Sequence, residues 1–196
     1  KDLKHAVIVG GGLIGIEMAE MFHSRHIPVT FLVREDLYWN AVLPTEESEM
    51  VSRHIVESGI DLRLKTELKE IIDDGTGKAC AAITNKDERI DCQFVGLTAG
   101  VHPNIGFIKE SAPEIEVGRG ILVNEQLETS VKDIYAIGDC AQLRNPNEGR
   151  RPIEAVWYTG KMMGETVAYT VCGQPQNYNP SIWFNSAKFV DIEYQV

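Results

Sequence analysis

The sequence lacks several features that would indicate particular classes of protein. Basic residues are outnumbered, 19 against 29 acidic, and the formal charge of −10 argues against a nucleic-acid surface. No apolar run approaches the roughly 20 residues needed to span a bilayer, and no signal peptide is visible. There are only four cysteines, without C-x-x-C spacing, which disfavours a zinc ribbon or a local redox pair: Cys80, Cys92, Cys140 and Cys172. We therefore expect a cytoplasmic protein with no nucleic-acid, membrane or metal partner, whose cysteines are reduced and buried.

What is present is typical of a globular protein. Hydrophobic residues make up 43% of the 196 residues and charged residues 24%, so we expect a packed core. This length accommodates one large domain, or one domain and a piece of another. The chain starts at Lys1 rather than Met, and the segment 189–196 reads as a strand that stops in its middle. We therefore expect that both ends have been cut from a longer protein.

A glycine motif near the start carries the strongest chemical signal. The short apolar run 6–9 predicts a buried parallel strand, and Gly10, Gly12 and Gly15 follow it in the order G-x-G-x-x-G. The first glycine permits a tight turn and the second lets the backbone approach a pyrophosphate. The third permits close packing of the next helix, whose N-terminus faces the phosphates. With a second strand at 29–33, this predicts a dinucleotide-binding βαβ unit.

The end of the second strand predicts which nicotinamide dinucleotide binds. An acidic residue there binds the ribose 2′-hydroxyl of NAD, whereas a nearby arginine suits the 2′-phosphate of NADP. Val33 occupies the expected acidic position, and Arg34 and Glu35 follow it. Val33 with Arg34 leans slightly towards NADPH, while Glu35 is close enough to serve NADH. A solvated surface role for Arg34 also stays open.

The rest of the chain reads as further α/β structure. Ile14, Met18, Met21 and Phe22 predict one apolar helix face. A second helix follows Pro44-Thr45 and ends at Gly59, before a strand at 60–64. Short β-prone segments between 67 and 91 predict a three-stranded antiparallel meander, and 94–100 returns to the parallel sheet. Further strands are expected at 121–123 and 134–137, and a helix within 153–171.

Three ordered motifs resemble those of one known family. They are the run Val-Gly-Gly-Gly-Leu-Ile-Gly-Ile-Glu-Met-Ala (9–19), the glycine motif Thr-Ala-Gly-Val-His-Pro-Asn (98–104), and Glu-Thr-Ser-Val-Lys-Asp-Ile-Tyr-Ala-Ile-Gly-Asp (128–139). The chain resembles the FAD-dependent pyridine nucleotide-disulfide oxidoreductases over nearly its whole length. The resemblance implies a Rossmann-like α/β fold with three parts: an NAD(P)-binding domain (1–110), the C-terminal half of an FAD-binding domain (111–180), and the start of a C-terminal β domain (181–196).

The resemblance also implies which residues would contact the cofactors. Residues expected at the NAD(P) site are Gly10, Gly12, Leu13, Ile14, Gly15, Val33, Arg34, Glu35 and Gly100. Asp139 would bind FAD at its ribityl or pyrophosphate region, with Gly138 permitting close backbone approach, although Asp139 also suits a helix N-cap. Glu17 matches an acidic residue near the flavin, or is a surface charge. The helix N-terminus near 151–157 would face the flavin, and Trp157 is expected mainly to pack.

The expected activity is hydride transfer from NAD(P)H to FAD, followed by electron transfer to an acceptor that the sequence does not identify. No side chain is a convincing acid–base catalyst. The first FAD-binding glycine motif is missing, so the expected partner is the N-terminal half of the same protein, and a homodimer is compatible with the resemblance. Two alternatives stay open: an isolated nucleotide-binding module, and a non-catalytic redox sensor of the same fold.

Overall fold

A computed structural model describes residues 3–195 of the chain. The described residues form two compact units, one of residues up to Val101 together with Ser186–Gln195, and one of His102–Asn185. The first unit is therefore discontinuous in sequence, because the second unit is inserted before its last two strands. The predicted domain boundaries, at 110/111 and 180/181, stay predictions, and residues 1–2 and 196 lie outside the described part. None of the described helices is both long and apolar enough to cross a bilayer.

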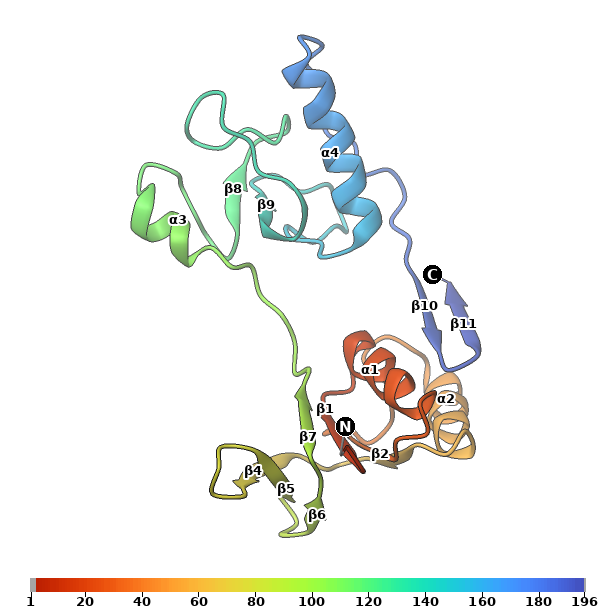
Figure 1. Ribbon diagram of the computed structural model, residues 1–196. Coiled ribbons are helices and arrows are strands. Elements are labelled where there is room, and N and C mark those ends of the chain that lie inside the picture. The colour runs from red at the N-terminus through yellow and green to blue at the C-terminus, as the bar shows by residue number, and fades with distance from the viewer. Residues whose placement is uncertain (1–2, 196) are drawn as a thin grey trace. The chain divides into compact units, whose positions relative to one another are not determined.

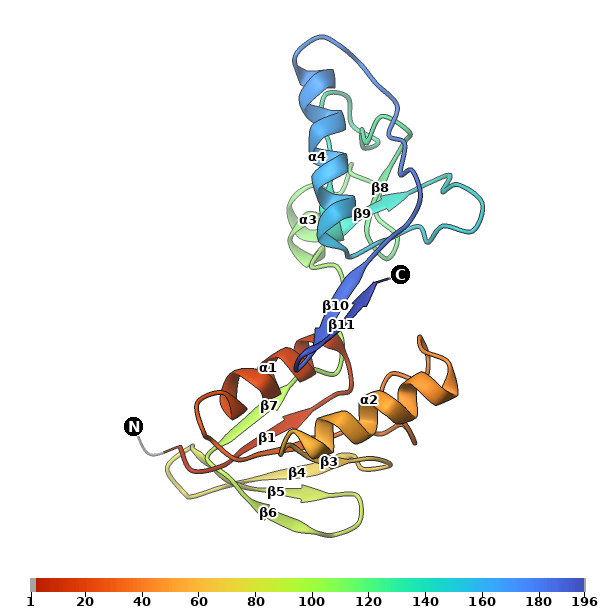
Figure 2. The same cartoon turned by 90° about the vertical axis from the view of Figure 1, so that its right-hand side faces the viewer.

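The first unit is a three-layer α/β structure (Figures 1 and 2). Its central parallel sheet has the strand order β3-β2-β1-β7, with β1 (Ala6–Val9), β2 (Val29–Leu32), β3 (Asp61–Arg63) and β7 (Phe94–Leu97). One face is covered by α1 (Leu13–His23) and α2 (Thr45–Glu57). The other is covered by the predicted antiparallel meander of β4 (Leu68–Asp73), β5 (Ala79–Thr84) and β6 (Arg89–Asp91).

This arrangement explains the continuous apolar run of β1. Successive strand side chains point to opposite faces of a sheet. Ala6 and Ile8 pack in the cluster under the helices, whereas Val7 packs with Ala82 and Cys92 of the meander layer. Because both faces are covered, β1 has no solvent side and carries apolar residues throughout.

The buried face of α1 differs from the predicted one. Ile14 and Met21 were expected to face the core, but they are 47% and 42% exposed. The buried residues of the helix are instead Gly15, Ile16, Ala19 and Phe22. Only a glycine can bring the helix this close to the turn, so the contact at Gly15 fixes the rotation of α1. Apolar periodicity alone could not predict that rotation.

A hairpin of two strands completes the first unit. Strands β10 (Ser186–Phe189) and β11 (Ile192–Gln195) pair in antiparallel fashion. Phe189 is fully buried in the cluster under the helices, and Ala187 and Tyr194 pack against the same cluster. The hairpin therefore belongs to the helical layer of the first unit, although 84 residues of the second unit separate it from Val101.

The second unit is smaller and has short elements: α3 (Gly106–Ser111), β8 (Ile121–Val123), the 3₁₀ turn η1 (Gly138–Cys140), β9 (Ala141–Leu143) and α4 (Trp157–Val171). Strands β8 and β9 are parallel, and Val123, Ala141 and Met163 lie in its core. The predicted strand at 134–137 is wrong. That segment forms only a single bridge between Glu128 and Tyr135, because the sequence beside it turns before a ladder can extend.

The cysteine predictions are confirmed in part. All four cysteines are free, and Cys92 is buried among apolar neighbours, which raises the pKa of its thiol. Cys80 and Cys140 are half-buried. Cys172 is exposed, so the prediction of a buried residue is wrong there. It is the C-cap of α4, one residue after the helix ends.

A buried ion pair, Arg150 with Glu154, connects two loops of the second unit. The Arg150 guanidinium donates to both carboxylate oxygens of Glu154 at 2.6 Å, and also to the carbonyl oxygens of Pro180 and Ser181. The carboxylate raises the pKa of Arg150. Both side chains are almost fully buried. The pair therefore ties the loop before α4 to the segment that leads out of the unit.

We predict that Arg150→Ala lowers the free energy of unfolding of the second unit by about 3 kcal/mol, because it leaves a buried carboxylate without its partner. Lys161→Ala is the matched control, since it breaks the exposed ion pair to Glu165 and should cost less than about 1 kcal/mol. Denaturant unfolding in a Trp39→Phe background, where Trp157 and Trp183 report on this unit, measures both. Equal losses in the two variants would contradict the prediction.

Candidate functional site

The turn between β1 and α1 is built from the predicted glycines. Gly10 has φ of 116°, a left-handed conformation, and a Cβ there would lie 2.6 Å from the Thr98 carbonyl oxygen. A Cβ on Gly15 would collide with the Gly10 carbonyl oxygen and lie 2.9 Å from the Thr98 hydroxyl. These two positions therefore require glycine for steric reasons within the protein itself.

Gly12 differs from its two neighbours in the motif. A Cβ on Gly12 would meet no atom within 4 Å, and its φ of −89° suits any residue. No contact inside the described part of the chain explains a glycine at this position. Open space at the N-cap of a helix is what close approach of a ligand requires, which is the expected role of the second glycine.

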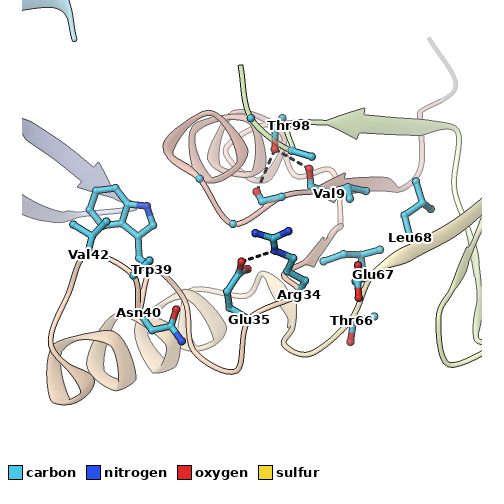
Figure 3. Close-up of a pocket in the computed structure, with 17 residues that line it drawn as sticks. Val9, Arg34, Glu35, Trp39, Asn40, Val42, Thr66, Glu67, Leu68 and Thr98 are labelled. Carbon is cyan, nitrogen blue, oxygen red and sulfur yellow. Dashed lines mark hydrogen bonds and ion pairs between the residues drawn. The ribbon is translucent and has the colours of Figure 1, made fainter. Parts of the chain in front are cut away.

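Thr98 is a site residue for which the sequence alone indicated no role, although it opens the glycine motif 98–104. Its hydroxyl donates to the Val9 carbonyl oxygen at 2.9 Å and lies 3.2 Å from the Gly10 carbonyl oxygen (Figure 3). It joins the end of β7 to the glycine turn. A threonine two residues before Gly100 in the second glycine motif is the signal that could have indicated this. Gly100 itself has φ of 111°.

The N-terminus of α1 offers free backbone donors. Gly12 is the N-cap, and no side chain caps the helix. The first turn of an α-helix has no intrahelical acceptors for its N–H groups, so the amides of Leu13 and Ile14 are available. No acidic residue lies in that turn. An anionic group, such as a pyrophosphate, complements this end of the helix.

A pocket of about 550 Å³ opens beside this turn (Figure 3). The volume lies within the range of small-molecule sites. Its walls come from five segments: the glycine turn, the end of β2, the loop before α2, the start of β4, and Thr98–Gly100 after β7. Labelled lining residues in Figure 3 include Arg34, Glu35, Trp39, Glu67 and Thr98.

The residues at the end of β2 that were predicted to distinguish NADH from NADPH differ in their access to the pocket. Val33 is fully buried against Gly11 and does not line the pocket. The Arg34 side chain is 75% exposed, lines the pocket and donates to the Glu35 carboxylate at 2.7 Å. That hydrogen bond raises the pKa of the guanidinium, and the charge of Glu67 adds to it. Arg34 is therefore positioned at the pocket, but its charge is already balanced by two acidic residues.

The residues expected near a flavin belong to different units of the chain. Glu17 is exposed on α1 in the first unit. Gly138 and Asp139 lie in η1 of the second unit, where Gly138 has φ of 73° and a Cβ would meet nothing within 4 Å. Asp139 is exposed and caps no helix by its side chain.

The N-terminus of α4 lies beside Gly138. A Cβ on Gly160 would be 3.5 Å from the Gly138 Cα, and the Gly138 N–H points to the Met163 sulfur at 3.3 Å. Small residues thus let η1 approach the helix. The N-cap Val156 contributes no side-chain cap at this end of α4. Trp157 is 71% exposed, so it does not pack in the core of this unit, and packing at an interface stays a prediction.

Comparison with known proteins identifies the family. Residues 1–164 match the model of the pyridine nucleotide-disulphide oxidoreductases. The chain belongs to this family. Members of it are FAD-dependent and use NAD(P)H. The recognition and fold class predicted from the sequence are confirmed.

Curated relatives resemble the chain at moderate identity. It is 29% identical over 97% of its length to an NAD(P)H coenzyme A polysulfide/persulfide reductase of Pyrococcus horikoshii, covering 42% of that protein. It is 34% identical over 72% of its length to a nitric oxide reductase FlRd-NAD(+) reductase of Klebsiella pneumoniae, covering 37% of that protein. The chain thus spans less than half the length of these relatives.

Solved structures share the fold. A ferredoxin reductase from Rhodopseudomonas palustris superposes with a TM-score of 0.87 at 24% identity, over 99% of this chain and 47% of that one. An NAD-dependent persulfide reductase from A. fulgidus gives a TM-score of 0.86 at 23% identity, over 98% of this chain and 35% of that one. Both confirm a family α/β fold built from the parallel sheet and the three-stranded antiparallel sheet.

The glycine turn gives a testable contrast in stability. Gly10→Ala should lower the free energy of unfolding by about 2 kcal/mol or more, because the alanine would be strained at a left-handed φ and would crowd the Thr98 carbonyl. Gly12→Ala should change it by less than about 0.5 kcal/mol, because the added methyl enters open space. Denaturant unfolding of both variants measures this. A destabilised Gly12→Ala would show that the turn has tighter requirements than its contacts indicate.

Proposed function

We propose that the chain binds NAD(P)H at the glycine turn and belongs to a flavoprotein oxidoreductase that passes hydride from NAD(P)H to FAD. The open position at Gly12 beside the free N-terminus of α1 carries this proposal. A pyrophosphate bound there would accept hydrogen bonds from the Leu13 and Ile14 amides. The adenosine ribose would then lie towards the end of β2, near Arg34 and Glu35.

The second unit supports the flavin part of the proposal. Asp139 is exposed, and its carboxylate can accept from two ribityl hydroxyls at once. The left-handed Gly138 leaves space beside it, and the positive N-terminal end of the α4 dipole would favour negative charge on a reduced flavin. The two cofactors, when bound, supply the hydride chemistry, and these residues orient and stabilise them. Glu17 is proposed to lie near the flavin, paired with a lysine of the N-terminal half of the same protein.

The electron acceptor is left unassigned in this proposal. The relatives are named for different reactions, among them persulfide reduction and, for a protein of Enterococcus faecalis, NADH oxidation. No side chain of the chain's two candidate sites, as described, selects one of these acceptors. The proposal keeps the cytoplasmic location expected from the sequence.

A second candidate function is a nucleotide-binding module without turnover. It is favoured by one observation, that every residue lining the pocket lies in the first unit. A non-catalytic redox sensor of the same fold would share the nucleotide site.

Absorbance and calorimetry separate these functions. We expect the 196-residue chain to bind NADH or NADPH by isothermal titration calorimetry, and the complete protein to show flavin absorbance that NAD(P)H bleaches under anaerobic conditions. A complete protein that binds FAD but is reduced by neither nucleotide would refute the oxidoreductase proposal. A chain that binds neither nucleotide would refute the nucleotide site.

The open position also predicts a loss of binding without a loss of fold. Gly12→Ala should weaken NADH binding by on the order of tenfold or more, because its methyl group would occupy the space that the pyrophosphate needs. Calorimetry on the folded variant tests this, with Gly106→Ala as the control, because a Cβ there also enters open space and Gly106 does not line the pocket. Unchanged NADH affinity in Gly12→Ala would count against the site.

Nucleotide preference is tested at Arg34. Arg34→Ala should weaken the binding of NADPH by on the order of tenfold and the binding of NADH by less, because only NADPH has a 2′-phosphate for the guanidinium. Glu35→Gln should strengthen NADPH, because it frees Arg34 from its carboxylate partner. Equal changes for the two nucleotides in Arg34→Ala would remove the lean towards NADPH.

A further inference from the structure

Trp39 combines an unusual backbone with a position at the pocket. Its φ is 62°, a left-handed conformation that bulky residues rarely adopt. Its indole lines the pocket beside the glycine turn (Figure 3). Such a conformation persists only where the surrounding structure over-determines it, and these conformations cluster at ligand sites. The sequence alone predicts only a loop at 37–43.

The loop that carries Trp39 is fixed to the helical layer. Tyr38 is fully buried, and its N–H donates to the Ser52 hydroxyl of α2 at 3.0 Å. The N–H groups of Val42 and Leu43 both donate to the Trp39 carbonyl oxygen, at 2.9 and 3.0 Å. The backbone of Trp39 is therefore held on both sides along the chain.

The indole ring is held by the hairpin β10–β11. Phe189 meets it edge-on with the ring centroids 4.9 Å apart, and Tyr194 does so at 5.5 Å. Figure 3 shows the hairpin beside Trp39 and away from Arg34. The ring thus has the hairpin as one neighbour and the pocket as another. Edge-to-face contacts of this kind fix ring orientation as well as position.

The hairpin is itself attached to both helices. Lys188 pairs with Glu20 of α1 at 3.2 Å, and Asp191 pairs with His54 of α2. With the buried Phe189, these contacts give the hairpin a defined place against the helical layer. Residues about 150 positions after Trp39 therefore determine where the pocket wall lies.

We propose that Trp39 contacts the adenosine half of the bound dinucleotide, and that Phe189 and Tyr194 are positioning residues that hold its ring. This inference rests on the proposed nucleotide site. Arg34 and Glu35 line the same pocket at the end of β2, where the adenosine ribose of a dinucleotide lies in this fold. A rigid aromatic surface suits a planar base at that end of the pocket.

The contact is tested with ADP-ribose, which has the adenosine half and the pyrophosphate but no nicotinamide. Trp39→Ala should weaken both NADH and ADP-ribose about tenfold by calorimetry on the 196-residue chain, while Trp39→Phe should keep most of the affinity. Loss confined to NADH, or no loss with either ligand, would overturn the assignment.

Positioning is tested in the hairpin. Tyr194→Ala and Phe189→Ala should each weaken ADP-ribose several-fold, whereas Glu193→Ala, an exposed change in the same hairpin, should not. Tyr194 is only half-buried, so Tyr194→Ala still tests the positioning role if Phe189→Ala fails to fold. NADH quenching of Trp39 emission, in a Trp157→Phe, Trp183→Phe background, should fall in both variants. Hairpin variants that lose thermal stability but keep ADP-ribose affinity and quenching would overturn the positioning role.

The outcomes separate this inference from the function on which it rests. An unchanged chain that binds neither NADH nor ADP-ribose refutes the nucleotide site and the inference with it. If the wild-type chain binds both ligands and a folded Trp39→Ala variant binds them with equal affinity, the nucleotide site is supported and only the role of Trp39 is overturned.

Discussion

The close approach of Gly10, Gly15 and Thr98 is the constraint on which the first unit depends. Three elements meet there: the turn after β1, the first turn of α1 and the end of β7. They pack so closely that a Cβ on Gly10 or Gly15 would collide with a neighbouring element, and the Thr98 hydroxyl donates to the Val9 carbonyl oxygen. The contact sets the rotation of α1, which in turn decides which of its residues enter the core. It also places the helix N-terminus at the edge of the sheet, where the pocket opens.

Charge in the pocket is arranged in two regions. The free amides of α1 supply a fixed positive end without any charged side chain nearby in that turn. At the end of β2, in contrast, Arg34 is matched by Glu35 and faces the charge of Glu67. An anion is therefore favoured at the helix more than at Arg34. In the proposed site, the pyrophosphate that both nicotinamide dinucleotides contain would lie at the first region, and the ribose 2′ position at which they differ would lie at the second.

The chain order of the two units has a structural consequence. The second unit, which carries Gly138 and Asp139, interrupts the first, and the chain then returns as the hairpin β10–β11. The return is stabilised by apolar burial of Phe189 and by pairs to α1 and α2. The pocket wall at Trp39 is thereby tied to a segment that follows the whole second unit in the sequence.

The sequence alone determined most elements of the first unit and the family. Local signals were sufficient for the βαβ unit, since its strand, glycine turn and helix are adjacent in the sequence. They were also sufficient for the meander, because Gly and Asp residues mark its turns. Tertiary structure decided the rest. Contacts between distant segments fixed the exposed sides of Ile14 and Met21, gave Thr98 its hydroxyl role, and buried Val33 beside Gly11. Trp39 meeting Phe189 could not be read from sequence, because no local pattern records which side chains pack across 150 intervening residues.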